Sequence, residues 1–190
     1  RETNGTAPCN LFKAMGLDYI YVNQGNDTKA LVEAFQKVKN SSQPVVVHIN
    51  TLKGKGYEPA EQNKEQWHFS GPFDLETGKP LYTSNTEDYA GITRDYLLKK
   101  MKEDSSVVAI TSGTPAVMGF TEDKRKEAGR QFIDVGIAEE TAVALASGIA
   151  ANGGKPVYGV YRSSVQRTSD QIAQDLCINS SPATIVTFWG

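Results

Sequence analysis

The chain has 190 residues, of which 39% are hydrophobic and 22% are charged, and its formal net charge is −2. This composition is ordinary for a globular protein and argues against disorder. Lysines are scattered among acidic residues without a basic stripe, which argues against nucleic-acid binding, and no apolar run approaches the roughly 20 residues of a membrane helix.

The first five residues, RETNG, are polar and unlike a signal peptide. Cys9 and Cys177 have neither metal-ligand spacing nor the pattern of a disulfide framework, so we expect two free thiols and no structural zinc. A cytoplasmic protein fits these features best. Because the sequence lacks an initial methionine and stops in a strand-like run, we also expect a fragment.

The first predicted element is an amphipathic helix capped by residues 26–28, with apolar residues at positions 31, 32, 35 and 38 on one face. Residues 44–49, PVVVHI, form a short β-branched run typical of a buried parallel strand, expected at the centre of a sheet. His48 within it is interpreted as a hydrogen-bonded core histidine. From Gly54 to about Asn85 the composition predicts a long ordered loop and then an interdomain linker.

A second series alternates helices and strands. Helices are predicted at 86–102, 139–151 and 164–179, and strands at 107–111, 132–134, 157–161 and 184–188. This alternation predicts an α/β fold with mainly parallel sheets and flanking helices. Ligands of such sheets lie beyond the carboxyl ends of the strands. Thr114, Glu139 and Tyr161 each follow a strand and should therefore lie at one edge.

The stretch from Phe132 to Glu140 runs an apolar strand directly into an acidic helix start. Glu139 and Glu140 fall in the first helical turn, where the helix dipole favours negative charge. A carboxylate there can take part in chemistry, but simple helix capping explains the same position.

Four sequence motifs occur in a recognisable order. They are GKGYEPAE at 54–61 followed by WH at 67–68 and GPFD at 71–74, then TPA at 114–116, IAE at 137–139, and Tyr161 with QR at 166–167 and DQ at 170–171. Together they resemble the thiamine-diphosphate enzymes of the transketolase superfamily, in particular the 1-deoxy-D-xylulose-5-phosphate synthases. The series from 54 to 74 is the most family-specific, and the resemblance covers the chain from Asn10 to Gly190.

The resemblance implies a thiamine-diphosphate-binding fold made of parts of two domains. Residues 1–83 correspond to the C-terminal part of the diphosphate-binding domain plus a linker, and residues 84–190 to the N-terminal part of the pyrimidine-binding domain. It also implies thiamine diphosphate and Mg²⁺ as cofactors, pyruvate and D-glyceraldehyde 3-phosphate as substrates, and a homodimer. No G-D-G motif with a downstream asparagine is present, so the metal and diphosphate ligands are expected upstream of this chain.

Site residues follow from the same resemblance. Glu139 would bond the aminopyrimidine ring of the cofactor and activate it, and His68 would assist proton transfer. The other cofactor-binding residues would be Thr114 and Lys53, and the substrate-binding residues would be Tyr57, Tyr161 and Arg167. Lys53 begins a Gly-Lys turn that is not a P-loop. Arg167 suits phosphate binding, although a surface ion pair with Asp170 or Glu140 is an alternative.

Several positions depart from the family pattern. Ser164 stands where the family has an aromatic residue that stacks on the aminopyrimidine, and Thr141 where it commonly has histidine; the other departures are Arg162, Ser169 and Asn26. These changes leave two alternatives open. One is a transketolase-type ketol transfer between sugar phosphates, and the other is a non-catalytic paralogue that acts as a partner subunit.

Overall fold

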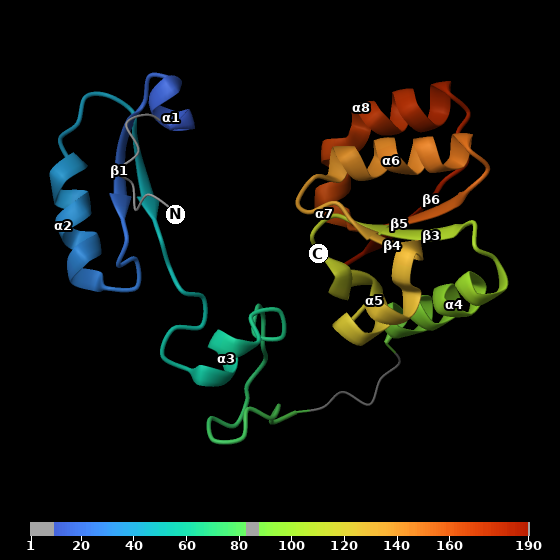
Figure 1. The fold of residues 1–190 in the computed structure, drawn as a ribbon, viewed down its shortest axis with the longest axis horizontal. Coiled ribbons are helices and arrows are strands. Elements are labelled where there is room, and N and C mark those ends of the chain that lie inside the picture. The colour runs from blue at the N-terminus through green and yellow to red at the C-terminus, as the bar shows by residue number, and fades with distance from the viewer. Residues whose placement is uncertain (1–9, 83–87, 190) are drawn as a thin grey trace. The chain divides into compact units, whose positions relative to one another are not determined.

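The computed structural model describes residues 10–82 and 88–189, and the chain divides into two compact units, residues 1–84 and 85–190 (Figure 1). The described residues contain no helix that is both long and apolar enough to cross a membrane. Cys177 is a free, exposed thiol, as predicted; Cys9 lies outside the described residues.

The first unit is built around two parallel strands. Its elements are α1 (Leu11–Ala14), β1 (Asp18–Val22), α2 (Thr28–Val38), β2 (Val45–Ile49) and α3 (Glu58–Gln62). The two strands pair in register from Asp18 with Val45 to Val22 with Ile49. Their carboxyl ends therefore lie side by side.

Helix α2 forms where the sequence predicts it. The Asp27 side chain caps it by accepting hydrogen bonds from the amides of Lys29 and Ala30, at 2.7 and 3.1 Å. Its apolar face is less covered than expected, because Val32 is 52% exposed and Phe35 is 50% exposed. Much of the apolar surface of this unit is thus accessible.

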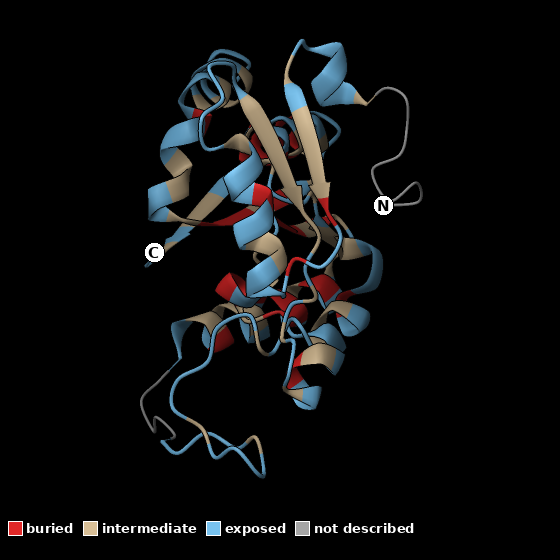
Figure 2. Cartoon of the chain, turned by 90° about the vertical axis from the view of Figure 1, so that its left-hand side faces the viewer, coloured by how far each residue is buried: buried red, intermediate tan, exposed pale blue. Residues whose placement is uncertain are grey.

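Residues 45–49 form the predicted strand, but its expected central position is wrong. Among the described residues β2 pairs only with β1, and all five of its residues are half-buried (Figure 2). His48 is hydrogen-bonded as predicted, through Nδ1 to the Tyr19 hydroxyl at 2.6 Å, although it is not fully buried. The adjacent strand β1 was not predicted.

The second unit is a four-stranded parallel sheet in the order β4-β3-β5-β6. Its strands are β3 (Val107–Thr111), β4 (Phe132–Asp134), β5 (Lys155–Tyr161) and β6 (Thr184–Phe188). Its regular α-helices are α4 (Tyr89–Glu103), α5 (Glu122–Ala128), α6 (Glu139–Ala151), α7 (Arg162–Val165) and α8 (Ser169–Gln171). Shorter 3₁₀ turns are η1 (Pro115–Met118), η2 (Gly129–Gln131) and η3 (Gln166–Thr168), and η4 (Ile172–Ile178) is a π-helix.

Helices cover both faces of this sheet, with α6 and α8 on one side and α4 and α5 on the other (Figure 1). Side chains of β3 alternate between the two layers, as the period of a strand requires. Ala109 packs in the cluster that contains Leu97 of α4, whereas Ile110 packs in the cluster that contains Val143 of α6. The predicted α/β class with parallel, helix-flanked sheets is confirmed.

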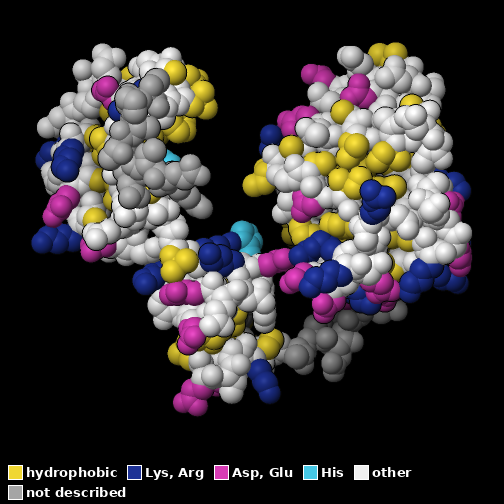
Figure 3. Space-filling view, viewed as in Figure 1, with side chains coloured by type: hydrophobic (Ala, Val, Ile, Leu, Met, Phe, Trp, Pro, Cys, Tyr) yellow, Lys and Arg dark blue, Asp and Glu magenta, His cyan; other side chains and the backbone are white. Residues whose placement is uncertain are grey.

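Hydrophobic and charged side chains occupy different parts of the face of the second unit seen in Figure 3. Hydrophobic side chains gather over α6 and the sheet, and charged side chains gather over α4 and α5. Ion pairs account for much of that charge, for example Lys102 with Glu127 at 2.8 Å and Lys126 with Glu122 at 2.7 Å. The layer of α4 and α5 is therefore held together partly at its solvent face.

Several predicted boundaries differ from the structure; for example, β5 begins at Lys155, two residues before the predicted start. The helix expected from residue 86 begins at Tyr89, where Asp88 caps it; residues 83–87, where the linker was expected, lie outside the described residues. The helix expected at 164–179 begins at Arg162 and is a succession of α, 3₁₀ and π turns.

Candidate functional site

The carboxyl ends of the four parallel strands of the second unit meet at one edge of the sheet, which we call the carboxyl edge. Thr111, Asp134, Tyr161 and Phe188 are the last residues of β3, β4, β5 and β6. Ligand sites of such sheets form at this edge. Thr114 and Glu139 follow two of these strands and Tyr161 ends a third, so the prediction that they share an edge agrees with the topology.

Asp134 joins the two loops that carry Thr114 and Glu139. Its Oδ1 accepts hydrogen bonds from the amides of Gly113 at 2.7 Å and Gly136 at 2.9 Å. Both glycines have left-handed φ angles, +74° and +73°, which glycine adopts without the strain of a Cβ. Sequence reasoning assigned no role to Asp134; an aspartate that ends a strand two residues before a glycine is the signal that could have found it.

Glu139 is the first residue of α6 and is only 5% exposed. Its Oε2 has no hydrogen-bond partner among the described residues, and it lies 3.3 Å from Nη1 of Arg167 in an ion pair. Ala142 and Val143, in the same helical turns, are fully buried. Because a buried polar oxygen without a hydrogen bond is costly, a ligand group that bonded this oxygen would relieve a cost that, among the described residues, is offset by the ion pair with Arg167.

Arg167 bridges two carboxylates. Besides the contact with Glu139, its Nη2 donates to Oε1 of Glu140 at 3.3 Å. The alternative ion pair with Glu140 that the sequence allowed is therefore present. The structure brings the predicted cofactor carboxyl and the predicted substrate arginine into direct contact.

A buried tyrosine lies in the strand beside this group. Tyr158 of β5 is fully buried, and its hydroxyl lies 2.9 Å from that of Ser112. Burial raises the pKa of Tyr158; the hydrogen bond with Ser112 opposes this, and the charges of Glu139 and Glu140 add to the increase. Tyr158 therefore stays protonated and neutral, and sequence reasoning did not single it out.

The remaining predicted residues of this unit lie at the same edge with fewer contacts. Thr114 is half-buried and precedes η1, and its side chain makes no capping hydrogen bond. Tyr161 is half-buried at the end of β5. Thr111, at the end of β3, is fully buried, and its Oγ1 has no hydrogen-bond partner within the described part of the chain.

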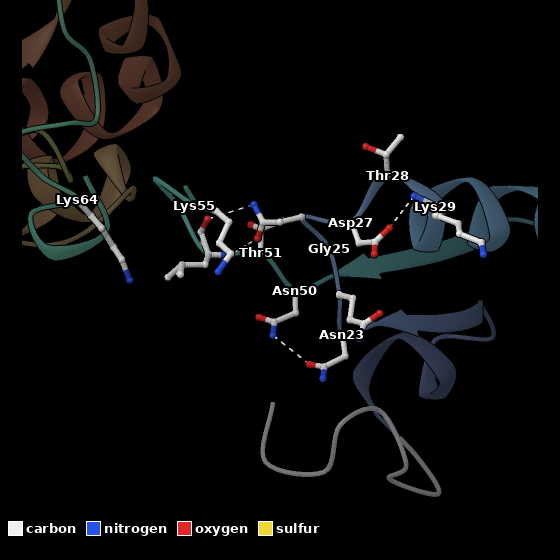
Figure 4. A pocket seen from close by; sticks show the side chains of 12 residues that line it. Asn23, Gly25, Asp27, Thr28, Lys29, Asn50, Thr51, Lys55 and Lys64 are labelled. Carbon is white, nitrogen blue, oxygen red and sulfur yellow. Dashed lines mark hydrogen bonds between the residues drawn. The ribbon is translucent and has the colours of Figure 1, made fainter. Parts of the chain in front are cut away.

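The first unit has an open pocket of about 940 Å³ at the carboxyl ends of β1 and β2 (Figure 4). Gly25 lies in the wall of this pocket. A glycine is needed there because an added Cβ would be 2.4 Å from the carbonyl oxygen of Asn50. The Asn26 amide donates to the Leu52 carbonyl at 3.2 Å and accepts from the Leu52 amide at 2.7 Å. Asn26 therefore fastens the chain immediately before Lys53. Three lysines also line the pocket, namely Lys29, Lys55 and Lys64.

Lys53 and His68 are in contact. Nζ of Lys53 and Nδ1 of His68 form a side-chain hydrogen bond, and both residues are exposed. Lys53 does not belong to the lining of the pocket. The structure thus pairs a predicted cofactor residue with a predicted proton-transfer residue within the first unit.

Tyr57 packs in an aromatic cluster with Trp67 and Phe73, with ring centroids 4.6–5.7 Å apart. Its hydroxyl donates to the Leu75 carbonyl at 3.2 Å. Gly54 lies close to Ala60, since an added Cβ would be 2.6 Å from the Ala60 carbonyl carbon. These contacts give the motif at 54–74 a structural basis; the substrate-binding role of Tyr57 stays a prediction.

Comparison with known proteins identifies the second unit. The family model of the transketolase pyrimidine binding domain matches residues 87–190, more than half of the chain. The chain belongs to this family. A second model, 1-deoxy-D-xylulose-5-phosphate synthase, matches residues 2–51, and the predicted resemblance is confirmed.

Curated relatives carry the same name. The chain is 43% identical to 1-deoxy-D-xylulose-5-phosphate synthase 1 of Geobacter sulfurreducens over 92% of its length, and 40% identical to the synthase of Clostridium perfringens strain 13 over 94%. It spans only 28% of either relative. A solved structure titled a split-gene transketolase, inactive β4 tetramer, covers 52% of this chain and 33% of its own, with a TM-score of 0.42 at 18% identity.

Metal ligands are not gathered in the described part of the chain. No group of three or more histidine, cysteine, aspartate or glutamate side chains there could hold a metal ion.

Proposed function

We propose that the complete protein is a thiamine-diphosphate-dependent 1-deoxy-D-xylulose-5-phosphate synthase. It would join pyruvate to D-glyceraldehyde 3-phosphate with loss of CO₂, and its product would feed isoprenoid precursor synthesis. The relatives' names, the two family models and the order of the motifs support this proposal. The observation that carries it is the buried Oε2 of Glu139 at the carboxyl edge, which has no hydrogen-bond partner among the described residues.

The residues at this edge fit the cofactor. The aminopyrimidine ring of thiamine diphosphate offers a hydrogen-bonding nitrogen, and Oε2 of Glu139 has no hydrogen-bond partner among the described residues. When bound, the cofactor supplies a carbon nucleophile that attacks a keto group. Glu139 would transfer a proton at its carboxyl oxygen, and the buried side chains of Ala142 and Val143, in the same helical turns, would help to exclude water there.

Other residues would position the ligands. Thr114, on the loop fastened by Asp134, would line the cofactor site, and Tyr161 would contact the acceptor substrate. In the first unit Lys53 would contribute positive charge near the cofactor, and His68 would move a proton to or from the substrate. We further propose that Mg²⁺ and the diphosphate are held by segments outside this chain, and that the protein acts as a cytoplasmic homodimer.

The test uses the complete protein with pyruvate, D-glyceraldehyde 3-phosphate, thiamine diphosphate and Mg²⁺, and detects the five-carbon product by mass spectrometry. Glu139→Gln keeps the size of the side chain but removes the exchangeable carboxyl proton. It should reduce turnover by at least about 100-fold, the lower range for general acid–base catalysis. Glu103→Gln, an exposed carboxylate on α4, is the matched control and should leave turnover unchanged.

The alternatives give different results. If the protein transferred a ketol group between sugar phosphates and did not use pyruvate, its reaction would be of the transketolase type and the proposed reaction would be wrong. Failure of the wild-type protein to bind thiamine diphosphate in isothermal titration calorimetry would favour a non-catalytic paralogue. Full activity of Glu139→Gln would remove the central role of this carboxyl.

A further inference from the structure

Two arginines lie at the carboxyl edge, and their surroundings differ. Arg167 is already engaged by two carboxylates, since its Nη1 lies 3.3 Å from Glu139 and its Nη2 lies 3.3 Å from Glu140. An anionic substrate that approached this guanidinium would meet the carboxylates of Glu139 and Glu140 beside it. Arg167 is therefore a poor receptor for a phosphate group as long as these ion pairs persist.

No carboxylate of the described residues engages the guanidinium of Arg162. This arginine is the first residue after β5 and is exposed, and among the described residues it makes no ion pair or hydrogen bond. Its guanidinium carbon lies 4.0 Å from the centroid of the Trp189 ring. Stacking occupies the flat face of a guanidinium and leaves the N–H groups at its rim free to donate.

The sheet register explains why these two side chains meet. Tyr161 pairs with Phe188 in the ladder between β5 and β6. Arg162 and Trp189 each follow one of these paired residues, so both emerge at the carboxyl edge. Trp189 is 81% exposed, so it offers its ring to Arg162 without being part of the core.

We propose that Arg162, held by Trp189, is the guanidinium that binds the anionic end of the phosphorylated acceptor, and that Arg167 acts on Glu139 and Glu140 instead. This inference rests on the proposed function, because that function makes the acceptor a sugar phosphate. Arg162 is adjacent to Tyr161, the residue proposed to contact the same substrate. A planar guanidinium with a free rim matches phosphate oxygens in two-point geometry.

The experiment compares two acceptors in the complete protein, D-glyceraldehyde 3-phosphate and unphosphorylated D-glyceraldehyde. Arg162→Met keeps an apolar stem against Trp189 but removes the charge. It should raise KM for the phosphorylated acceptor by about 10- to 100-fold, as expected for loss of hydrogen bonds to a charged group. KM for pyruvate and the kinetics with unphosphorylated D-glyceraldehyde should not change. Arg162→Lys should fall between wild type and Arg162→Met.

Arg130→Met is the matched control, because Arg130 is also exposed but precedes β4 and so lies at the opposite edge of the sheet. It should leave both acceptors unaffected. A selective KM increase in Arg167→Met but not in Arg162→Met would overturn the assignment. Equal increases for both acceptors in Arg162→Met would overturn it too, because they would indicate a structural effect.

A binding measurement separates this inference from the proposed reaction. Inorganic phosphate added to the complete protein should change the tryptophan fluorescence of wild type, and the change should be absent in both Trp189→Phe and Arg162→Met. If wild type forms no product but shows this response, the proposed reaction fails and the anion site stands. If product forms and the fluorescence response persists in Arg162→Met, the anion site fails and the reaction stands.

Discussion

Gly159 of β5 is a position where the addition of a single methyl group should strongly disturb the packing at the carboxyl edge. An added Cβ there would lie 2.1 Å from Sδ and 2.2 Å from Cγ of Met118. Met118 is fully buried in η1, the turn that follows Thr114. Filling Gly159 must therefore displace the Met118 side chain, in the turn that follows Thr114.

The cost of Gly159→Ala can be worked from this contact. Non-bonded atoms settle about 3.5–4.0 Å apart, so the Met118 side chain has to withdraw by roughly 1.5 Å into a filled core. Overpacking of this kind costs about 1–3 kcal/mol, and the reduced freedom of the unfolded chain offsets about 0.4–1 kcal/mol of it. We expect a net loss of about 1–2 kcal/mol, or roughly 5–15 °C in the Tm of a unit of this size.

The assay is thermal unfolding followed by circular dichroism, with Gly148→Ala as the control. Gly148 lies on the exposed side of α6, and an added Cβ meets nothing within 4 Å, so this change should stabilise by about 0.5–1 kcal/mol. Adding Met118→Ala to Gly159→Ala should cost less than the sum of the two single changes, because the clash is removed. A Gly159→Ala variant as stable as wild type, or strict additivity, would refute the packing argument.

Three further predictions concern polar contacts. Asp134→Ala removes the acceptor of two backbone amides and should cost about 2–3 kcal/mol, with faster hydrogen exchange at Gly113 and Gly136 but not at Ala109. Asn26→Ala should cost about 1 kcal/mol by losing both hydrogen bonds to Leu52, seen as faster exchange of that amide. Two lysines hold the pKa of Glu127 down to about 2. Its stabilising effect is therefore complete above about pH 4.5 and is lost as the pH falls toward 2; Tm measured from pH 5 to 2 should decline less steeply in Glu127→Gln.

The sequence predicts the sheet of the second unit well because its strands are short β-branched runs between turn residues. It does not predict α5, whose sequence EDKRKEA has no apolar spacing; ion pairs such as that of Lys126 with Glu122 support it instead. The succession of α, 3₁₀ and π turns after Arg162 cannot be predicted from the spacing of apolar residues either. Thr168 and Ser169 donate side-chain hydrogen bonds to the carbonyls of Val165 and Gln166, at 2.6 and 2.8 Å, and compete with regular helical bonding.

In the candidate site, too, some features could be predicted from the sequence and others could not. Glu139 could be singled out because it lies on a family motif and on a local pattern, a strand end followed by a helix start, although that pattern alone is also explained by helix capping. Glu140 was one of the two alternative partners that the sequence suggested for Arg167, but Trp189 could not be recognised as the partner of Arg162, because the two residues are far apart in the sequence. Such contacts depend on strand register and on the fold of the intervening chain, which no local spacing encodes.

The departures from the family pattern take on a different meaning once the contacts are known. Arg162 departs from the family pattern, but its guanidinium lies over the ring of Trp189, and it follows β5 at the carboxyl edge, where an anionic substrate would enter. At the same edge, Oγ1 of Thr111 and Oε2 of Glu139 are buried and form no hydrogen bond with the residues that the structure describes, while the carboxylate of Asp134 accepts hydrogen bonds from backbone amides of the loops. The loops are thus fixed by the chain itself, and the unsatisfied groups are those for which a ligand would provide partners. Loops held in place by the chain, next to buried groups that a ligand could bond, are expected of an edge organised for binding rather than for stability alone.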